Sequence, residues 1–458
     1  MRSLIDGNKR VLCLVLFSIL FLTVACTRDK GKGDITGPVE TEIPSIRMAV
    51  FSDPHYYDPT LGTTSDSFVV DLARDRKMLV ESEAIMEAVT QIMRAQDVEV
   101  VLVPGDMTKD GVQQCHEKVA QYLAQIESSG KKVYVVPGNH DIDNPHAYSY
   151  PDNSEPVLEG NITAQGFESI YSEFGFAEAK YRDPNSLTYI AEPKKGIWIL
   201  AMDCCNYQGR FADITLTGGA FTAVTLEWIR SKLAEAAAKE ITVFGMMHHG
   251  VVEHFPGMDA VFVDYLLRDW QSVATEFAEL GLNVVFTGHH HATDISEYES
   301  NGSYIIDIQT GSTITWTCPY RLVYYDHEKK EISIDTYLID QINFDTGSTD
   351  FQTFAYDFMA TGLPPLVASE LGKLGVSPIL AGLLEPFVTP TLLAYYRGDE
   401  PDYVDEQLIS RIQGLAQTGD PMATMLSNLL LGIWYDSTPD NNVFIDLQSG
   451  AISKKVGT

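Results

Sequence analysis

The chain has 458 residues, of which 45% are hydrophobic, enough for a large globular domain with an appended segment. Its formal net charge of −31 disfavours nucleic acid polymers and anionic membrane surfaces as partners, because neither supplies a counter-charge. The few cysteines form no disulfide framework, and the adjacent pair Cys204 and Cys205 is expected to be small buried side chains.

The N-terminus has the pattern of a secretory signal. Basic residues precede an apolar stretch over 11–24, which is shorter than the roughly 20 residues that a membrane-spanning helix needs. The stretch ends in Thr-Val-Ala-Cys, which resembles a bacterial lipobox with Cys26 as the lipidated residue; an ordinary signal peptide is the alternative. We therefore expect a lipoprotein signal peptide over 1–25, a flexible tether over 26–45, and a domain held in the periplasm or at the surface of a bacterial envelope by its lipid alone.

From residue 46 the chain alternates between strand and helix patterns. Strands are predicted over 47–53, 98–104, 132–136, 186–191 and 196–202, and helices over 82–95 and 114–126. The periodicity lapses over 144–184, apart from a short helix near 167–174. This alternation favours a layered α/β core.

The second half first continues this alternation and then becomes helical. Helices are predicted over 223–239 and 263–280, and strands over 241–247, 283–287, 304–309 and 320–338. Beyond 345 the strand signal disappears, and helices are predicted over 351–359, 369–374, 378–388, 392–397, 402–415 and 421–434. The pattern predicts a main domain over 46–344 and a C-terminal helical subdomain over 345–458.

Five polar clusters follow the ends of five apolar runs. They contain Asp53 and His55; Asp106; Asn139, His140 and Asp141; His248 and His249; and His289, His290 and His291. Gly105, Gly138 and Gly288 lie at three of these ends, where we expect backbone angles that other residues resist. Imidazole, carboxylate and amide ligands delivered from strand ends suit two divalent metal ions a few Å apart, a centre that assists attack on phosphate esters.

The spacing within the clusters suggests how ligands are shared. Asp53 and His55 are two residues apart, so on an extended chain both side chains face one way and can bind one metal. Asp106 follows a glycine and is free to bridge two cations. His289 and His291 repeat the two-residue spacing and send one imidazole to each metal, or both to a shared edge.

The ordered motifs Asp-x-His, Gly-Asp, Gly-Asn-His-Asp, His-His and Gly-His-x-His resemble the calcineurin-like metallophosphoesterase superfamily over about residues 46–340. The resemblance implies a four-layer α/β/β/α sandwich and two divalent ions, with Mn, Fe, Zn and Co as candidates. It implies that Asp53, His55 and His291 hold metal one, that Asn139, His248 and His289 hold metal two, and that Asp106 bridges them. It further implies that a hydroxide between the metals attacks phosphorus, that His140 protonates the leaving group, and that Asp141 orients His140 or a ligand histidine.

Other residues are candidates for substrate contact or for packing. The candidates that could line the cleft are His249, His146, His254, Tyr148 and Tyr150. His290 lies between two ligands and faces the other way, so we expect it behind the ligands or at the surface. His116 is expected to be solvated.

A narrower resemblance is to the branch that contains class III cyclic-nucleotide phosphodiesterases and secreted relatives with a helical C-terminal domain. It rests on the Gly-Asn-His-Asp motif at 138–141, on Ile142, Asn144 and Pro145, and on the helical tail. It implies a phosphodiesterase that acts on a small phosphate ester, with cyclic nucleotides among its candidate substrates. A phosphomonoesterase or nucleotidase, a phospholipid-headgroup or wall-polymer esterase, and a non-catalytic binding lipoprotein stay open; the last predicts a missing ligand, and none is missing. The oligomeric state is open.

Overall fold

The computed structural model describes residues 44–73, 75–152, 155–373, 375–436 and 438–456. The predicted signal peptide, Cys26 and the tether up to residue 43 lie outside the described residues.

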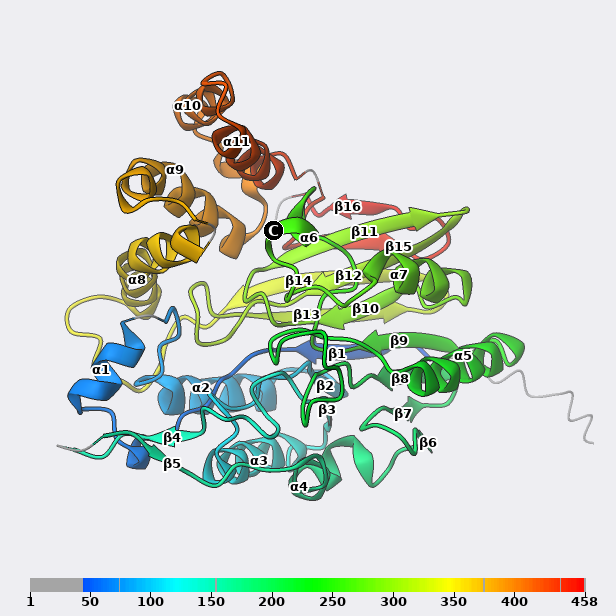
Figure 1. The fold of residues 1–458 in the computed structure, drawn as a ribbon. Helices are drawn as coiled ribbons and strands as arrows, with labels where there is room; N and C mark the ends of the chain where they lie inside the picture. The colour runs from blue at the N-terminus through cyan, green and yellow to red at the C-terminus, as the bar shows by residue number, and fades with distance from the viewer. Residues whose placement is uncertain (1–43, 74, 153–154, 374, 437, 457–458) are drawn as a thin grey trace, which may run out of the picture. The chain divides into compact units, whose positions relative to one another are not determined.

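Two seven-stranded sheets form the centre of the fold (Figure 1). The first has the order β16-β15-β14-β13-β1-β2-β3. Its strands are β1 (Ile46–Val50), β2 (Val100–Val103), β3 (Lys132–Val135), β13 (Pro319–Asp326), β14 (Glu331–Leu338), β15 (Val443–Asp446) and β16 (Ile452–Lys454). Strands β1, β2 and β3 run parallel, so their carboxyl ends lie at one edge of the sheet.

The second sheet has the order β11-β12-β10-β9-β8-β7-β6. Its strands are β6 (Tyr181–Arg182), β7 (Tyr189–Lys194), β8 (Ile197–Ala201), β9 (Thr242–Met246), β10 (Val284–Thr287), β11 (Asp294–Ser300) and β12 (Ser303–Gln309). Strands β8, β9, β10 and β12 are parallel neighbours. A separate hairpin joins β4 (Tyr148–Ser149) to β5 (Val157–Leu158).

The sheets pack face to face, and helices cover their outer faces. On β8, Ile197 and Ile199 belong to the core that also contains the first sheet, whereas Trp198 and Leu200 pack on the helical side. Both faces of this strand are therefore buried, which contributes about 1.5–3 kcal/mol for each large apolar side chain. Helices α2 (Ser82–Ala95) and α3 (Gln113–Glu127) cover the first sheet, and α5 (Ala223–Ala238) and α7 (Trp270–Glu279) cover the second (Figure 1). The predicted four-layer α/β architecture is confirmed.

Short helices occupy the connections. They are η1 (Pro59–Leu61), α1 (Asp66–Leu72), α4 (Ala164–Ile170), η2 (Ser172–Phe176), α6 (Met258–Val261) and η3 (Glu400–Tyr403). Helix α1 and strand β11 were not predicted, and α7 begins at Trp270 rather than near 263.

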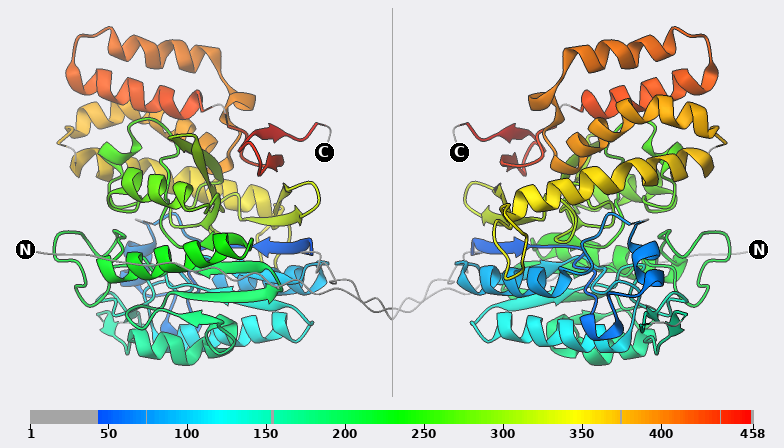
Figure 2. Two further views of the ribbon diagram at one scale, coloured as in Figure 1. Left: turned by 90° about the vertical axis from the view of Figure 1, so that its right-hand side faces the viewer. Right: turned by 90° about the vertical axis from the view of Figure 1, so that its left-hand side faces the viewer.

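Four helices follow the sheets and gather beside the second one: α8 (Phe351–Lys373), α9 (Pro378–Arg397), α10 (Glu406–Ala416) and α11 (Pro421–Trp434) (Figure 2). The predicted helices left gaps over 360–368 and 389–391, but α8 continues through Pro364 and Pro365, and α9 continues through Pro390. A proline removes one helix hydrogen bond, and apolar packing between α8 and α9 compensates for this loss. Helix α9 has the length and composition of a membrane span, yet 44% of that window is buried inside the protein.

The end of the chain departs from the prediction of an all-helical tail. After α11 the chain returns to the first sheet, where β15 pairs with β14 and places Ile445 opposite Ile332. Val443 and Ile445 are fully buried there. Strand β15 was not predicted because its few apolar residues are flanked by asparagine and aspartate, which are typical of a loop.

Candidate metal centre

The predicted ligands converge because they follow parallel strands. Asp53 follows β1, Asp106 follows β2, Asn139 follows β3, His248 follows β9, and His289 follows β10. The carboxyl ends of these strands meet at the same side of the sandwich, where ligands of open α/β sheets characteristically bind. This topology brings residues more than 230 positions apart into direct contact.

Four buried side chains surround the first position. The ligand atoms of Asp53, His55, Asp106 and His291 all lie within 4.8 Å of one another. The Nε2 atom of His55 is 2.9 Å from Nε2 of His291 and 3.4 Å from Oδ2 of Asp106. The His291 Nε2 atom is 3.6 Å from Oδ1 of Asp53.

A second position adjoins the first and shares one carboxylate with it. Asp106, His248 and His289 also offer ligand atoms within 4.8 Å of one another. The His248 Nε2 atom lies 3.2 Å from Oδ2 of Asp106 and 3.1 Å from the amide oxygen of Asn139. Asp106 therefore belongs to both groups, as a bridging ligand would.

The ring nitrogens are held in orientation from behind. The Nδ1 atom of His248 donates to the Pro104 carbonyl at 2.8 Å, and Nδ1 of His291 lies 3.0 Å from the Thr315 hydroxyl oxygen. These contacts leave both Nε2 atoms aimed at the shared centre, as in metal sites whose ligands are fixed by outer hydrogen bonds.

The donor set fits cations. Burial lowers the pKa of His55 well below its ordinary value, with the Lys77 charge adding to the effect, and burial likewise lowers the pKa of His291. Both rings therefore favour the neutral form, in which either Nε2 atom can bind a metal ion, and the two Nε2 atoms face each other. Two neutral imidazoles in this arrangement, beside two carboxylates, suit a divalent ion.

The backbone at the ligands is not the extended chain that the two-residue spacing suggested. Asp53, His55, Asp106, His289 and His291 all have positive φ values, between 38° and 76°. Such left-handed conformations are costly outside glycine and cluster at functional sites. The side chains converge through these turns rather than through the alternation of a strand.

Two of the three motif glycines are required for space rather than for their angles. A Cβ at Gly138 would lie 2.1 Å from Oδ1 of Asp106, and one at Gly288 would lie 2.4 Å from Oδ2 of Asp53. Only Gly105 has the expected positive φ, of 100°. Glycine thus lets the neighbouring loops approach both carboxylates closely.

His140 lies beside the metal ligands and reaches the cavity. Its ring centroid is 4.8 Å from that of His55, and 27% of its side chain is exposed. Its Nδ1 atom lies 3.0 Å from Oδ1 of Asp110. Burial would lower the pKa of His140, but the charges of Asp106 and Asp110 outweigh it and raise that pKa.

The orienting role expected of Asp141 belongs to Asp110 instead. The Asp141 carboxylate accepts hydrogen bonds from the backbone N–H groups of Met107, Thr108 and Gly138, so it ties two metal-bearing loops together. Burial and the Asp106 charge raise its pKa to about 7. Asp110 was not singled out in the sequence, because nothing in its spacing distinguishes it from an ordinary loop carboxylate.

His116 is buried rather than solvated. Its Nδ1 atom lies 2.9 Å from the Tyr171 hydroxyl, and its Nε2 atom lies 2.9 Å from the Asp141 carbonyl oxygen. It therefore supports the loop that carries His140.

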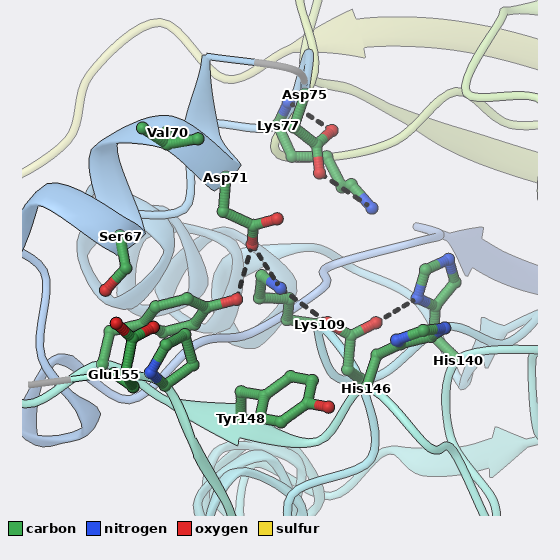
Figure 3. A pocket seen from close by; sticks show the side chains of 13 residues that line it. Ser67, Val70, Asp71, Asp75, Lys77, Lys109, His140, His146, Tyr148 and Glu155 are labelled. Atoms are coloured by element: carbon green, nitrogen blue, oxygen red, sulfur yellow. Dashed lines mark hydrogen bonds and ion pairs between the residues drawn. The ribbon is translucent and has the colours of Figure 1, made fainter.

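A cavity of about 630 Å³ opens beside His140 (Figure 3). Its lining includes Asp71, Asp75, Lys77, Lys109, Asp110, His140, His146, Tyr148, Tyr150 and Glu155. Lys109 is held by Asp71 and Asp110 at 3.0 and 2.6 Å, whereas Lys77 contacts Asp75 at 3.3 Å. Of the predicted lining residues, His146, Tyr148 and Tyr150 thus line the cavity, and Lys77 and Lys109 join them.

His249 does not reach the cavity. It is fully buried, with Nε2 donating to the Thr217 carbonyl at 2.8 Å and Nδ1 lying 3.3 Å from Sγ of Cys204. Both ring nitrogens are occupied, so its predicted substrate contact is replaced by a packing role. Cys204 and Cys205 are buried, as expected.

His254 and His290 lie under the helices instead of in the cleft. The Tyr395 hydroxyl of α9 is 2.6 Å from Nδ1 of His254 and 3.3 Å from Nδ1 of His290. His290 separates the two ligands His289 and His291, so the C-terminal helices brace the metal-bearing loop.

Comparisons with known proteins identify one family. The family model described as calcineurin-like phosphoesterase matches residues 46–293, more than half of the chain. No curated protein matches the chain. Similar solved structures include a dimetal phosphatase from Danio rerio, 15% identical with a TM-score of 0.44, covering 65% of this chain and 98% of that one. Another is the purple acid phosphatase PPD1 from yellow lupin seeds, 13% identical with a TM-score of 0.42, covering 65% of this chain and 52% of that one.

Proposed function

Given that the chain belongs to the calcineurin-like phosphoesterase family, we propose that it is a phosphoesterase that uses two divalent metal ions to hydrolyse a small phosphate ester. The observation that carries this proposal is the Asp106 carboxylate, which belongs to both buried ligand groups. Asp53, His55 and His291 would hold one ion, and Asn139, His248 and His289 the other. When bound, the ions supply an activated water and neutralise charge on the phosphoryl group.

The chain's own residues supply orientation and a proton. His140 is the partly exposed imidazole between the ligand groups and the cavity. Despite its burial, the charges of Asp106 and Asp110 raise its pKa and so favour the protonated ring, and Asp110 fixes that ring through Nδ1. The Nε2–H is then available to protonate the oxygen of the leaving group, which is general acid catalysis.

Within this class we propose a phosphodiesterase, with cyclic nucleotides among its candidate substrates. The cavity beside His140 has the volume of a small-molecule site and would hold an esterified group. Tyr148 lies on its wall and offers a flat face to a ring (Figure 3).

A phosphomonoesterase or nucleotidase is the second candidate, and Lys77 is the observation that favours it. This ammonium is nearly buried, lines the cavity, and is close enough to the centre for its charge to lower the pKa of His55 beyond the effect of burial. A cation there would favour binding of a phosphate monoester, which carries one more negative charge than a diester. A phospholipid-headgroup or wall-polymer esterase fits the same centre.

Hydrolysis of two model substrates distinguishes these proposals. The purified protein, reconstituted with Mn²⁺, would be assayed on bis(p-nitrophenyl) phosphate and p-nitrophenyl phosphate, and then on a cyclic-nucleotide panel. A higher kcat/KM on the diester supports the phosphodiesterase, and a higher value on the monoester supports the second candidate. Turnover of neither substrate by protein with two bound metals would contradict the proposed activity on small esters.

For location, we propose attachment of the domain to the bacterial envelope through lipidated Cys26. The basic and apolar pattern before Cys26 supports it.

A further inference from the structure

A second group of carboxylates lies away from the dimetal centre, where the C-terminal helices join the sheets. Asp294 begins β11, and Asp436 and Asp440 follow α11. Their carboxylate oxygens lie within 4.8 Å of one another. Asp294 and Asp440 are almost completely buried. Like charges this close in a dry interior repel strongly unless a cation or protons neutralise them.

Two more acids add to the negative charge. Asp399 and Asp440 form two reciprocal hydrogen bonds. The Asp440 N–H donates to Oδ1 of Asp399 at 2.7 Å, and the Asp399 N–H donates to Oδ2 of Asp440 at 2.6 Å. Glu400 is next to it and is only 1% exposed. Five carboxyl groups from three separate segments therefore meet here.

Three basic side chains lie near these acids. The Arg321 guanidinium is buried, but it donates to the carbonyl oxygens of Asp440 at 2.6 Å and Asp294 at 3.3 Å rather than to their carboxylates. Lys454 is 3.1 Å from Asp399 but is shared with Asp402. Arg397 lies near Glu400 and stacks on the Tyr403 ring.

The neighbouring histidine supplies no further charge. Nδ1 of His254 is 3.6 Å from Oδ2 of Asp294. Burial lowers the pKa of His254 to about 3, so its ring is neutral. Burial and neighbouring acids raise the pKa of Asp294 and that of Asp440 above the ordinary value, so these carboxyl groups lose their protons readily only if a cation takes their place.

Glu400 provides an observation independent of the three clustered aspartates. Its Oε2 atom is buried and has no hydrogen-bond partner among the described residues. Burial and the charges of Asp440 and Asp436 together raise the pKa of this carboxyl group well above the ordinary value. A buried carboxylate oxygen without a partner is costly and indicates a ligand that completes its shell.

We propose that Asp294, Asp436, Asp440 and Glu400 form a third cation site, which binds one Ca²⁺. The ligands offered are carboxylate oxygens, which calcium prefers in flexible arrangements of six to eight oxygens, with water completing the shell. The dimetal centre instead offers imidazole nitrogen, which suits transition metals. The two kinds of site are therefore chemically distinct.

The site would connect the helices to the metal-bearing loop. Asp294 follows His291 by three residues, Glu400 begins η3 after α9, and Asp440 precedes β15. One ion would hold all three segments together, and with them the loop of His289 and His291. We therefore expect calcium to stabilise the fold without taking part in hydrolysis.

Calcium binding to the full chain tests the proposal. Protein loaded with Mn²⁺ would be equilibrated with Ca²⁺ and its metal content and thermal midpoint measured. We expect one Ca²⁺ per chain in addition to the transition metals, and a rise in the midpoint. Asp440→Asn and Glu400→Gln should each weaken calcium affinity by about tenfold or more while the transition metals stay bound.

Two controls separate this site from other effects. Asp357→Asn removes an exposed acid of α8 and should leave calcium affinity unchanged. Asp106→Asn alters the dimetal centre and should retain the calcium-dependent rise in midpoint, so loss of hydrolysis and loss of this site are distinguishable. Absence of bound Ca²⁺, or a calcium effect that persists in Asp440→Asn and Glu400→Gln, overturns the proposal. Asp440→Asn and Glu400→Gln also remove repulsion between the acids, so these variants could be more stable than the native protein without calcium. Such a gain agrees with the proposal only if calcium no longer raises their thermal midpoint.

Discussion

Five of the predicted metal ligands adopt left-handed turns, and their side chains help to surround two adjoining positions. The sequence indicated Asp53, His55 and Asp106 because each ends a buried strand. It suggested an extended chain, whereas these residues adopt left-handed turns. Asp110 and Lys77 were not predicted from the sequence, because their roles depend on their proximity to residues that are distant in the chain.

The role of His140 can be separated from metal binding. His140→Ala should retain both metals and lower kcat by about 10²–10⁴-fold, because it removes a proton donor and no ligand. The loss should grow as the leaving group becomes more basic, which a series of aryl phosphate esters measures. Loss of metal from the variant would show instead that His140 is a ligand.

Lys77 should act on substrate binding. Lys77→Gln removes the ammonium that lines the cavity while keeping most of the side-chain length. We expect KM for p-nitrophenyl phosphate to rise by about tenfold, a loss of about 1.4 kcal/mol in binding, with a smaller effect on the diester. Lys329→Gln, in the exposed β13–β14 turn, is the matched control. An equal change in KM for both substrates would contradict a role of Lys77 in recognising the second negative charge of the monoester.

At the scale of elements, periodicity predicted the helices and strands of the α/β core well and the end of the chain poorly. Helix α2 has the predicted bounds, because its apolar residues repeat with helical spacing over a long window. The predicted gaps within α8 and α9 did not form, since tertiary packing overrides local propensity. Strand β15 is too short for its pattern to be distinguished from a loop.

The two faces of β15 should differ in their contribution to stability. Ile445→Ala removes a fully buried side chain and should lower the free energy of unfolding by about 2–5 kcal/mol. Phe444→Ala, on the neighbouring position with 39% exposure, should cost much less. Chemical denaturation measures both values. Equal losses would mean that β15 does not join the sheet in the register described.

At the scale of the whole molecule, the acidic charge and the N-terminal pattern suggest where the enzyme works. A chain of net charge −31 has little electrostatic attraction for anionic lipid, so membrane attachment should depend on the lipid at Cys26. In the native host, Cys26→Ser should move the protein from the membrane fraction to the soluble fraction, which fractionation and immunoblotting detect. Continued membrane retention would contradict the lipid anchor.

At this scale the motifs predicted the fold, but they did not predict that the C-terminal helices would contact the loop that carries His289 and His291. The five strand-end clusters implied the sandwich because they require parallel strands that end side by side. The contact of Tyr395 with His290 depends on how α9 packs, and a helical pattern alone does not specify its partner.

The most direct test of the account is a joint measurement of metal content and phosphate-ester hydrolysis in the Asp106→Asn variant. This change keeps the shape of the side chain and removes the charge shared by both ligand groups; Asp97→Asn, whose side chain is 91% exposed, is the control. We predict two Mn²⁺ per chain and hydrolysis in the native protein and the control. In Asp106→Asn we predict loss of at least one ion and a fall in kcat of about 10³-fold or more. Two tightly bound ions and undiminished hydrolysis in Asp106→Asn would contradict a centre bridged by this carboxylate.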